Sequence, residues 1–307
     1  MLAYISRRLG LSALVVVGVS VLVFMMLHLV PGNPVLVMLS ESQSVTSAKS
    51  LEHELGLDQP LYKQYFDYID RAVHGDLGRS IRLRLPVAAL IWGRVGNTLQ
   101  LAVVSLALAI VLGTMLGTLA AAYRGRLIDY GVTVGALVGV SLPSFFLGIL
   151  LLLLFGLRLG WLPIAGNQDG LLSLVLPSIT LATIPLATIA RLTRSSVLNV
   201  LGEDHVRVAR AKGLCYRTVV VKHGLRNSLI PITTIIGVQF GSLLGGAVIV
   251  ETVFAWPGIG RLLVDAVNDR DFPLVQGIVL FVSIAFVLVN LLVDLLYAVL
   301  DPRVRYG

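Results

Sequence analysis

The sequence predicts an all-α polytopic membrane protein with six transmembrane helices, and two observations carry that prediction. The 307 residues are 56% hydrophobic and only 13% charged, whereas soluble domains carry about 25% charged residues. Several apolar runs also reach the ~20 residues that an α-helix needs to cross a bilayer. The single cysteine, Cys215, excludes an internal disulfide.

The first apolar run, about residues 9–30, follows Arg7 and Arg8 and looks at first like a signal peptide. It is longer than the usual apolar region of about 7–15 residues, and no small-residue cleavage motif follows it. We therefore expect residues 1–30 to form a retained transmembrane helix. The other five spans are expected at about residues 98–122, 131–157, 172–190, 230–251 and 275–298.

Residues 31–97 form a polar segment between the first two spans. Its stretch LEHELGLDQPLYKQYFDYIDRAVHG places apolar and charged residues at helical spacing, which predicts two short amphipathic helices. The motifs PGNP and HGDLGRS predict turns. Residues 98–307 are expected to form a core domain that holds the remaining five spans.

Lysine and arginine predict the orientation of the chain, because short cytoplasmic loops are enriched in them. With the N-terminus inside, the cytoplasmic pieces hold fourteen of these residues and the short outer loops hold three. Both termini are therefore expected in the cytoplasm, with residues 31–97 in the periplasm and the basic loop 191–229 in the cytoplasm. Charge alone leaves attachment of this loop to anionic lipids as one interpretation.

Small residues recur at four-residue spacing within the spans, where another backbone can approach closely. These residues are Gly113 and Gly117, then Gly131, Gly135 and Gly139, then Gly237, Gly241 and Gly245. Ordinary helix packing and a moving surface along a transport pathway both fit this pattern. Prolines at 143, 177 and 185 are expected to bend their helices. The candidate pathway residues are Gln239, Gly241, Gly245, Ser141 and Pro143.

The motifs of several enzyme classes are missing from the sequence. There is no P-loop, no HExxH, no GxSxG and no zinc-type spacing of histidine and cysteine. We therefore expect no catalytic residue, no metal site and no cofactor in this chain. Glu251 and Asp294 are expected at the membrane interface rather than in a proton relay. The chain is expected to be a passive part of an assembly that other subunits power.

The basic loop carries the most specific signal. EDHVRVARAKGL followed by KHGLRNSLIP resembles the cytoplasmic signature loop of permease subunits of bacterial ABC importers. The similarity covers the whole chain and includes LGLDQPLYKQY, NTLQLA, LPSITLA and VIVETVFAWPGIGRLLVDAV. It is strongest to the dipeptide, oligopeptide and nickel branch, and within it to dipeptide and glutathione permeases. The resemblance implies the type I importer permease fold.

In that family, a short helix, a glycine and a second short helix insert into a cleft on an ATPase subunit. The resemblance assigns this docking role to Glu203, Arg207, Ala209, Arg210, Ala211, Lys212, Gly213 and Leu214. Gly213 can adopt a positive φ and turn the chain sharply. Ala209 and Ala211 are small enough to enter a cleft, and the basic side chains can pair with acidic groups.

The chain departs from the family pattern at a few positions. Arg207, Val208 and Ala209 replace the Glu-Ala-Ala of the wider family, a change that is habitual in the peptide branch. Asn33 replaces a common Asp, and Gly96 replaces a common Pro. The stretch VFAWPGIGRLLVDA is expected to include a short re-entrant helix at the outer mouth.

The resemblance implies a permease that imports dipeptides, oligopeptides or glutathione across the bacterial inner membrane by alternating access. Expected partners are a second homologous permease, giving a heterodimer, two ATPase subunits that bind ATP and Mg, a periplasmic binding protein and membrane lipid, but no nucleic acid. A nickel or opine permease is the first alternative. A secondary transporter that works alone and a membrane-embedded enzyme are the rival classes.

Overall fold

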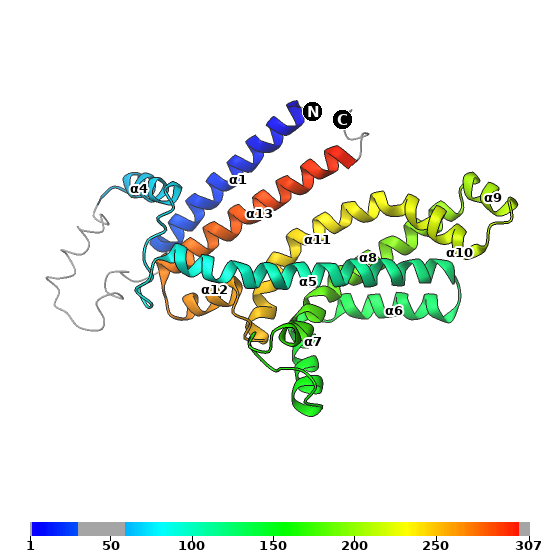
Figure 1. The fold of residues 1–307 in the computed structure, drawn as a ribbon. Coiled ribbons are helices and arrows are strands. Elements are labelled where there is room, and N and C mark those ends of the chain that lie inside the picture. The colour runs from blue at the N-terminus through cyan, green and yellow to red at the C-terminus, as the bar shows by residue number, and fades with distance from the viewer. Residues whose placement is uncertain (1, 30–58, 301–307) are drawn as a thin grey trace. The chain divides into compact units, whose positions relative to one another are not determined.

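The computed structural model describes residues 2–29 and 59–300, and it is built from helices (Figure 1). The predicted amphipathic helix upstream of residue 59 lies outside the described residues. The helices are α1 (Leu2–Leu29), α4 (Leu61–Val73), α5 (Val87–Ala122), α6 (Leu127–Ser141), α7 (Ser144–Leu151), η1 (Leu152–Arg158), α8 (Leu171–Leu201), α9 (Asp204–Ala211), α10 (Tyr216–Thr218), η2 (Val219–Leu225), α11 (Arg226–Val253), α12 (Ile259–Asn268) and α13 (Phe272–Leu300).

Four helices are long and apolar enough to cross a membrane by themselves, namely α1, α5, α8 and α13. Two bent pairs raise this number to six within the described residues if each pair is one span. The first pair is α6 with α7 and η1, and the second is formed by the two halves of α11. The predicted spans therefore correspond to helices, but the third and fifth are not straight. The 36 residues of α5 extend for about 54 Å, well beyond a hydrocarbon core of about 30 Å.

The bend in the third span follows from Pro143. Leu142 adopts an extended conformation with φ −82° and ψ 127°, because the proline ring disfavours a helical conformation in the residue before it. Consequently α6 ends at Ser141, and the helix that resumes at Ser144 is inclined by 106°. Figure 1 shows α7 leaving the direction of α6. In contrast, α8 continues as one helix through both Pro177 and Pro185.

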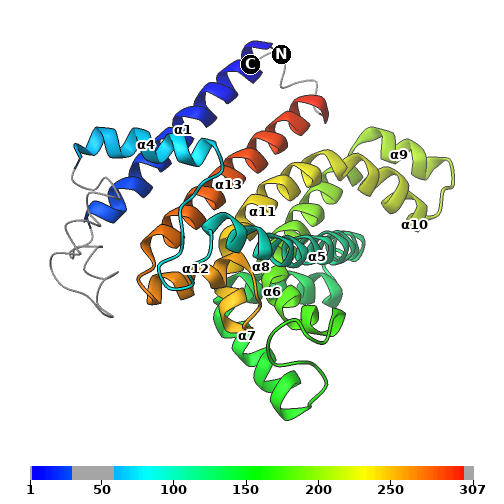
Figure 2. The same ribbon diagram turned by 60° about the vertical axis from the view of Figure 1, so that its left-hand side comes forward.

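The chain divides into two compact units, of which one comprises Asn97–Arg261 and Leu292–Gly307. In this unit α5, α6 and α8 lie side by side (Figures 1 and 2). A Cβ atom on Gly117 would lie 2.4 Å from the carbonyl oxygen of Ala190, and one on Gly139 would lie 3.1 Å from Thr183. The close helix approach expected at these glycines is confirmed, whereas Gly131 and Gly135 face open space.

The other unit comprises Met1–Gly96 and Leu262–Leu291. Here the hydroxyl groups of Ser20 and Tyr65 share a hydrogen bond of 2.8 Å, which joins α1 to α4. The side-chain amide of Gln276 donates to the carbonyl oxygen of Val23 at 3.0 Å and joins α13 to α1. Polar contacts thus fix these helices to one another where apolar packing alone would allow them to slide.

Candidate functional site

The candidate site is the basic segment, defined here as residues 203–229. It begins with Glu203 in an extended conformation, and the two turns of α9 follow directly. Lys212 ends the helix, and Gly213 has a φ of +78°, a value that glycine adopts without strain. The turn predicted at Gly213 is therefore confirmed. After Leu214 and Cys215 the chain continues as α10, η2 and the start of α11.

The basic segment packs on one face and exposes the other. Val206 and Val219 are fully buried and form an apolar cluster with Val200 at the end of α8. Ala209 is only 5% exposed, so it supports this packing from inside and does not project toward a partner. The exposed predicted docking residues are Glu203, Arg207, Arg210, Ala211, Lys212, Gly213 and Leu214.

The charged side chains of the segment are weakly engaged. Arg207 lies 3.2 Å from the carboxylate of Asp204, but both side chains are more than 70% exposed. An ion pair of that kind contributes only about 0–1 kcal/mol, so Arg207 can exchange partners at low cost. The guanidinium of Arg210 lies 6.0 Å from the centre of the Tyr216 ring, at the outer limit of a cation–π contact. These side chains therefore form a basic, exposed surface whose ion pairs can rearrange readily.

Cys215 lies in the turn of the basic segment and is exposed. Its sulfur lies 3.2 Å from the hydroxyl oxygen of Thr218. This hydrogen bond lowers the pKa of the Cys215 thiol below its ordinary value. A larger fraction is therefore thiolate at neutral pH, and the thiolate is the form that reacts with labelling reagents.

The basic segment is connected rigidly to the long helices. Tyr216 donates a hydrogen bond of 2.9 Å to the carbonyl oxygen of Ala122, the last residue of α5. A Cβ atom on Gly224 would lie 3.3 Å from Leu201 and 3.4 Å from Val197, both on α8. The π-helical turn η2 passes into α11 without leaving helical geometry, since Leu225 has φ −63° and ψ −47°. Figure 2 shows α9 and α10 together at one end of the unit.

Asp129 and Arg194 form a second polar contact at the same end of the unit. The carboxylate of Asp129 is buried and accepts hydrogen bonds from Arg194 at 2.5 and 2.8 Å. It also accepts one from the backbone N–H of Gly125 at 2.9 Å, so the turn between α5 and α6 is fixed to α8. The sequence does not reveal this pair, because the two residues are 65 positions apart. An acidic residue in the first turn of an apolar run is the signal that could have drawn attention to Asp129.

The opposite end of α11 holds Glu251, which is the third residue from the end of the helix and is fully buried within the protein. Its carboxylate accepts hydrogen bonds from the Thr98 hydroxyl at 2.7 Å and from the backbone N–H of Arg261 at 3.1 Å. A Cβ atom on Gly258 would lie 2.2 Å from this carboxylate. The loop that enters α12 is therefore folded tightly onto Glu251, and glycine is required at the contact.

The candidate pathway residues lie at the two bent spans. Ser141 and Pro143 are exposed at the break between α6 and α7. On α11, Gln239 is 9% exposed and Gly241 is buried, while Gly245 begins the second half of the bent helix and faces open space. Irregular backbone at membrane depth is tolerated only where protein buries it or where it lines a water-filled cavity. The two breaks therefore agree with a pathway at these spans. The side chain of Asp294 lies outside the described part of the chain.

Comparison with known proteins identifies the family. A profile described as "Binding-protein-dependent transport system inner membrane component" matches residues 113–306, and one for the N-terminal part of such components matches residues 1–84. The chain belongs to this family. It is 46% identical over 307 residues, the full length of both chains, to the glutathione transport system permease protein GsiC of Escherichia coli K12.

A second relative is the dipeptide transport system permease protein DppB of the same strain. It is 42% identical over 337 aligned residues that cover 100% of this chain and 99% of DppB. Among solved structures, a chain of the inward-facing MetNI methionine ABC transporter matches with a TM-score of 0.56 at 19% identity. The match covers 69% of this chain and 96% of that chain. The importer permease fold and the multi-pass membrane character are therefore confirmed.

Proposed function

We propose that this permease carries short peptides, such as dipeptides, oligopeptides or glutathione, into the cell across the bacterial inner membrane. The substrate class rests on the two full-length relatives, which are named as glutathione and dipeptide transport permeases. The observation that carries the mechanism is the basic segment, which combines an exposed charged face with rigid attachment to α5, α8 and α11. A nickel or opine permease remains the alternative.

The proposed partners follow from the family and from the geometry of the segment. Two ATPase subunits bind ATP and Mg, and each docks on the basic segment of one permease. A second homologous permease completes the translocation pathway as a heterodimer. A periplasmic binding protein delivers the substrate from the opposite side. With this arrangement, the chain itself performs no catalysis.

The proposed mechanism is alternating access, in which closure of the ATPase pair moves the basic segment. This displacement reaches the long helices through Tyr216, through the close packing at Gly224 and through the continuous passage from η2 into α11. No flexible linker separates the basic segment from the long helices at these points. The halves of α11 meet at 53°, and this bend is where the helix can change its angle. Glu251 holds the opposite end of α11 during the motion.

Reconstitution tests the proposed function. The chain is assembled with its partner permease, ATPases and binding protein in proteoliposomes, and uptake of labelled dipeptide, glutathione and Ni²⁺ is measured with and without ATP. We expect ATP-dependent uptake of a peptide. Uptake of Ni²⁺ alone would replace the peptide proposal with the nickel alternative, and uptake that needs no ATPase would contradict the importer mechanism.

A further inference from the structure

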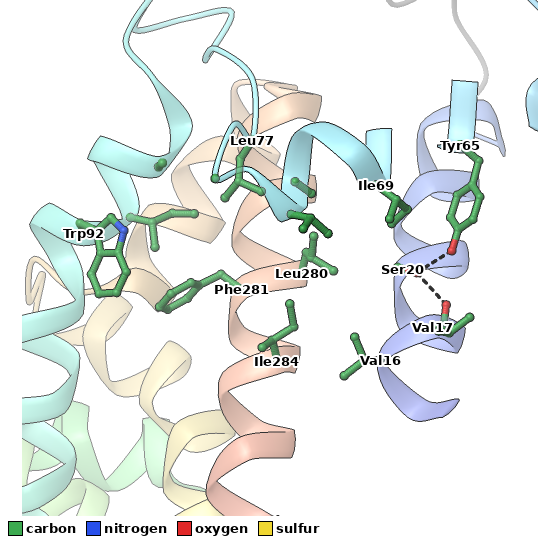
Figure 3. A pocket seen from close by; sticks show the side chains of 15 residues that line it. Val16, Val17, Ser20, Tyr65, Ile69, Leu77, Trp92, Leu280, Phe281 and Ile284 are labelled. Atoms are coloured by element: carbon green, nitrogen blue, oxygen red, sulfur yellow. Dashed lines mark hydrogen bonds between the residues drawn. The ribbon is translucent and has the colours of Figure 1, made fainter. Parts of the chain in front are cut away.

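We propose that the unit of Met1–Gly96 and Leu262–Leu291 holds one acyl chain of an anionic phospholipid in a groove between α1, α4, α5 and α13. The groove has a volume of about 380 Å³ (Figure 3). Its wall is apolar, and the side chains that form most of it include Val16, Val17, Ile69, Leu77, Ile91, Leu280, Phe281 and Ile284.

The two hydroxyl groups in the groove wall are already paired. The hydroxyl groups of Ser20 and Tyr65 bind each other at 2.8 Å, and the Ser20 hydroxyl also contacts the carbonyl oxygen of Val17 at 2.8 Å. Figure 3 shows these contacts at one side of the groove. A polar ligand would find few hydrogen-bonding partners here, and an apolar cavity of this kind does not retain water well. The wall therefore suits a hydrocarbon.

The groove runs from the expected headgroup level into the hydrocarbon. Val16 and Val17 lie at the centre of the apolar window Arg8–Met25, and Phe281 lies well inside the window Phe272–Val293. The other end is formed by Leu77 and by α4, which carries Tyr65, whereas Trp92 packs against Phe281 with the ring centres 5.6 Å apart and lies in the groove wall. Tyrosine concentrates at the interface between headgroups and acyl chains. This direction matches a lipid whose chain points into the bilayer.

Positive charge lies on the loop that joins two residues of the groove wall. The loop between Leu77 and Ala88, both of which line the groove, exposes Arg79, Arg82 and Arg84. The loop is well fixed, because the Asp271 carboxylate accepts hydrogen bonds from the Ser80 hydroxyl and from the backbone N–H groups of Ile81 and Arg82. Three arginines on a fixed loop favour an anionic headgroup over a zwitterionic one.

An irregular polypeptide fits the groove less well, because it would bring unpaired peptide groups to hydrocarbon depth, which is costly. An acyl chain has no such groups.

The test uses the assembled transporter in vesicles of phosphatidylglycerol and phosphatidylethanolamine. A phosphatidylglycerol that carries a diazirine in the middle of one acyl chain is photoactivated, and the labelled residues are mapped by mass spectrometry. We expect label to concentrate at residues 16–20, 69–73 and 280–284. Even labelling over all exposed apolar helix faces would overturn the proposal, as would protection of the groove by another polypeptide.

Two sets of variants sharpen the test. Ala72→Phe and Ala88→Phe fill the groove and should reduce its labelling severalfold, whereas Ala107→Phe, at an exposed position of α5 away from the groove, should leave it unchanged. Replacing Arg79 by Gln should lower the preference for phosphatidylglycerol over phosphatidylcholine by about fivefold, the contribution of one arginine near an anionic surface. Equal labelling by both lipids in the unaltered protein would overturn the assignment of an anionic headgroup.

Discussion

Single residues decide the shape of the basic segment, and Gly213 is the clearest case. Its φ of +78° is strained for a residue with a side chain, although a Cβ atom there would meet nothing within 4 Å. The constraint is therefore the backbone conformation alone. A left-handed conformation costs roughly 1–2 kcal/mol for an ordinary residue, more for a β-branched one, and less for asparagine.

Gly213→Val should therefore distort the turn and abolish productive docking, whereas Gly213→Asn should retain most of it. The measurements are co-purification of the ATPase subunits and ATP-driven uptake in membrane vesicles, with the amount of permease in the membrane as the control. Normal uptake and normal ATPase retention in Gly213→Val would show that the turn is dispensable.

Cys215 offers a second prediction at this scale. The hydrogen bond with Thr218 lowers the pKa of the Cys215 thiol. At pH values below the ordinary thiol pKa, Cys215 is therefore ionised to a greater extent than an ordinary cysteine. Thr218→Val should raise the pKa and slow maleimide labelling at neutral pH. The labelling rates of the unaltered protein and of the Thr218→Val variant should converge at alkaline pH, where Cys215 is ionised in both proteins. A rate difference that persists unchanged at alkaline pH would point to access, rather than ionisation, as its cause.

At the scale of elements, the buried carboxylate of Glu251 holds the conformation of the loop between α11 and α12. Gly258→Ala would place a methyl group on Glu251, and relief of such a clash costs typically 1–3 kcal/mol. Glu251→Ala would leave the Thr98 hydroxyl and the Arg261 N–H without this acceptor, at a similar cost.

Both variants should lower the thermal unfolding temperature of the purified chain. Gly245→Ala serves as the matched control, because its Cβ atom would meet nothing within 4 Å. A Gly258→Ala protein as stable as the Gly245→Ala control would contradict the described contact.

The charge of α9 gives another prediction for an element. Reversing Arg207, Arg210 and Lys212 to Glu should weaken ATPase binding while membrane insertion continues. If each exposed pair contributes about 1 kcal/mol, the loss is roughly 100-fold in affinity. Arg126→Glu, an exposed charge outside the basic segment, is the control. Loss of insertion with ATPase binding intact would instead favour attachment to anionic lipids.

For the whole molecule, sequence reasoning worked where the signal is local. Apolar run length predicted the spans, and the glycine after α9 predicted a turn, because both depend on consecutive residues. The burial of Glu251 could not be predicted, since its partner Thr98 is 153 positions away. The sequence predicts a docking contact at Ala209, but a small residue fits the packing within the basic segment as well as it fits a cleft on a partner. The sequence alone does not distinguish these two positions. The sequence indicated a bend at Pro143 but gave no measure of the 106° break.

The central claim is that the basic segment faces the cytoplasm and is covered by an ATPase subunit. The most direct test labels the single native Cys215 with a membrane-impermeant maleimide, with Asp67→Cys on α4 as a reporter for the other side. From the periplasmic side only the Asp67→Cys position should react. In inside-out vesicles Cys215 should react once the ATPases are stripped, and it should be protected again when they are added back. Labelling of Cys215 from the periplasmic side, or no protection by the ATPases, would contradict the account.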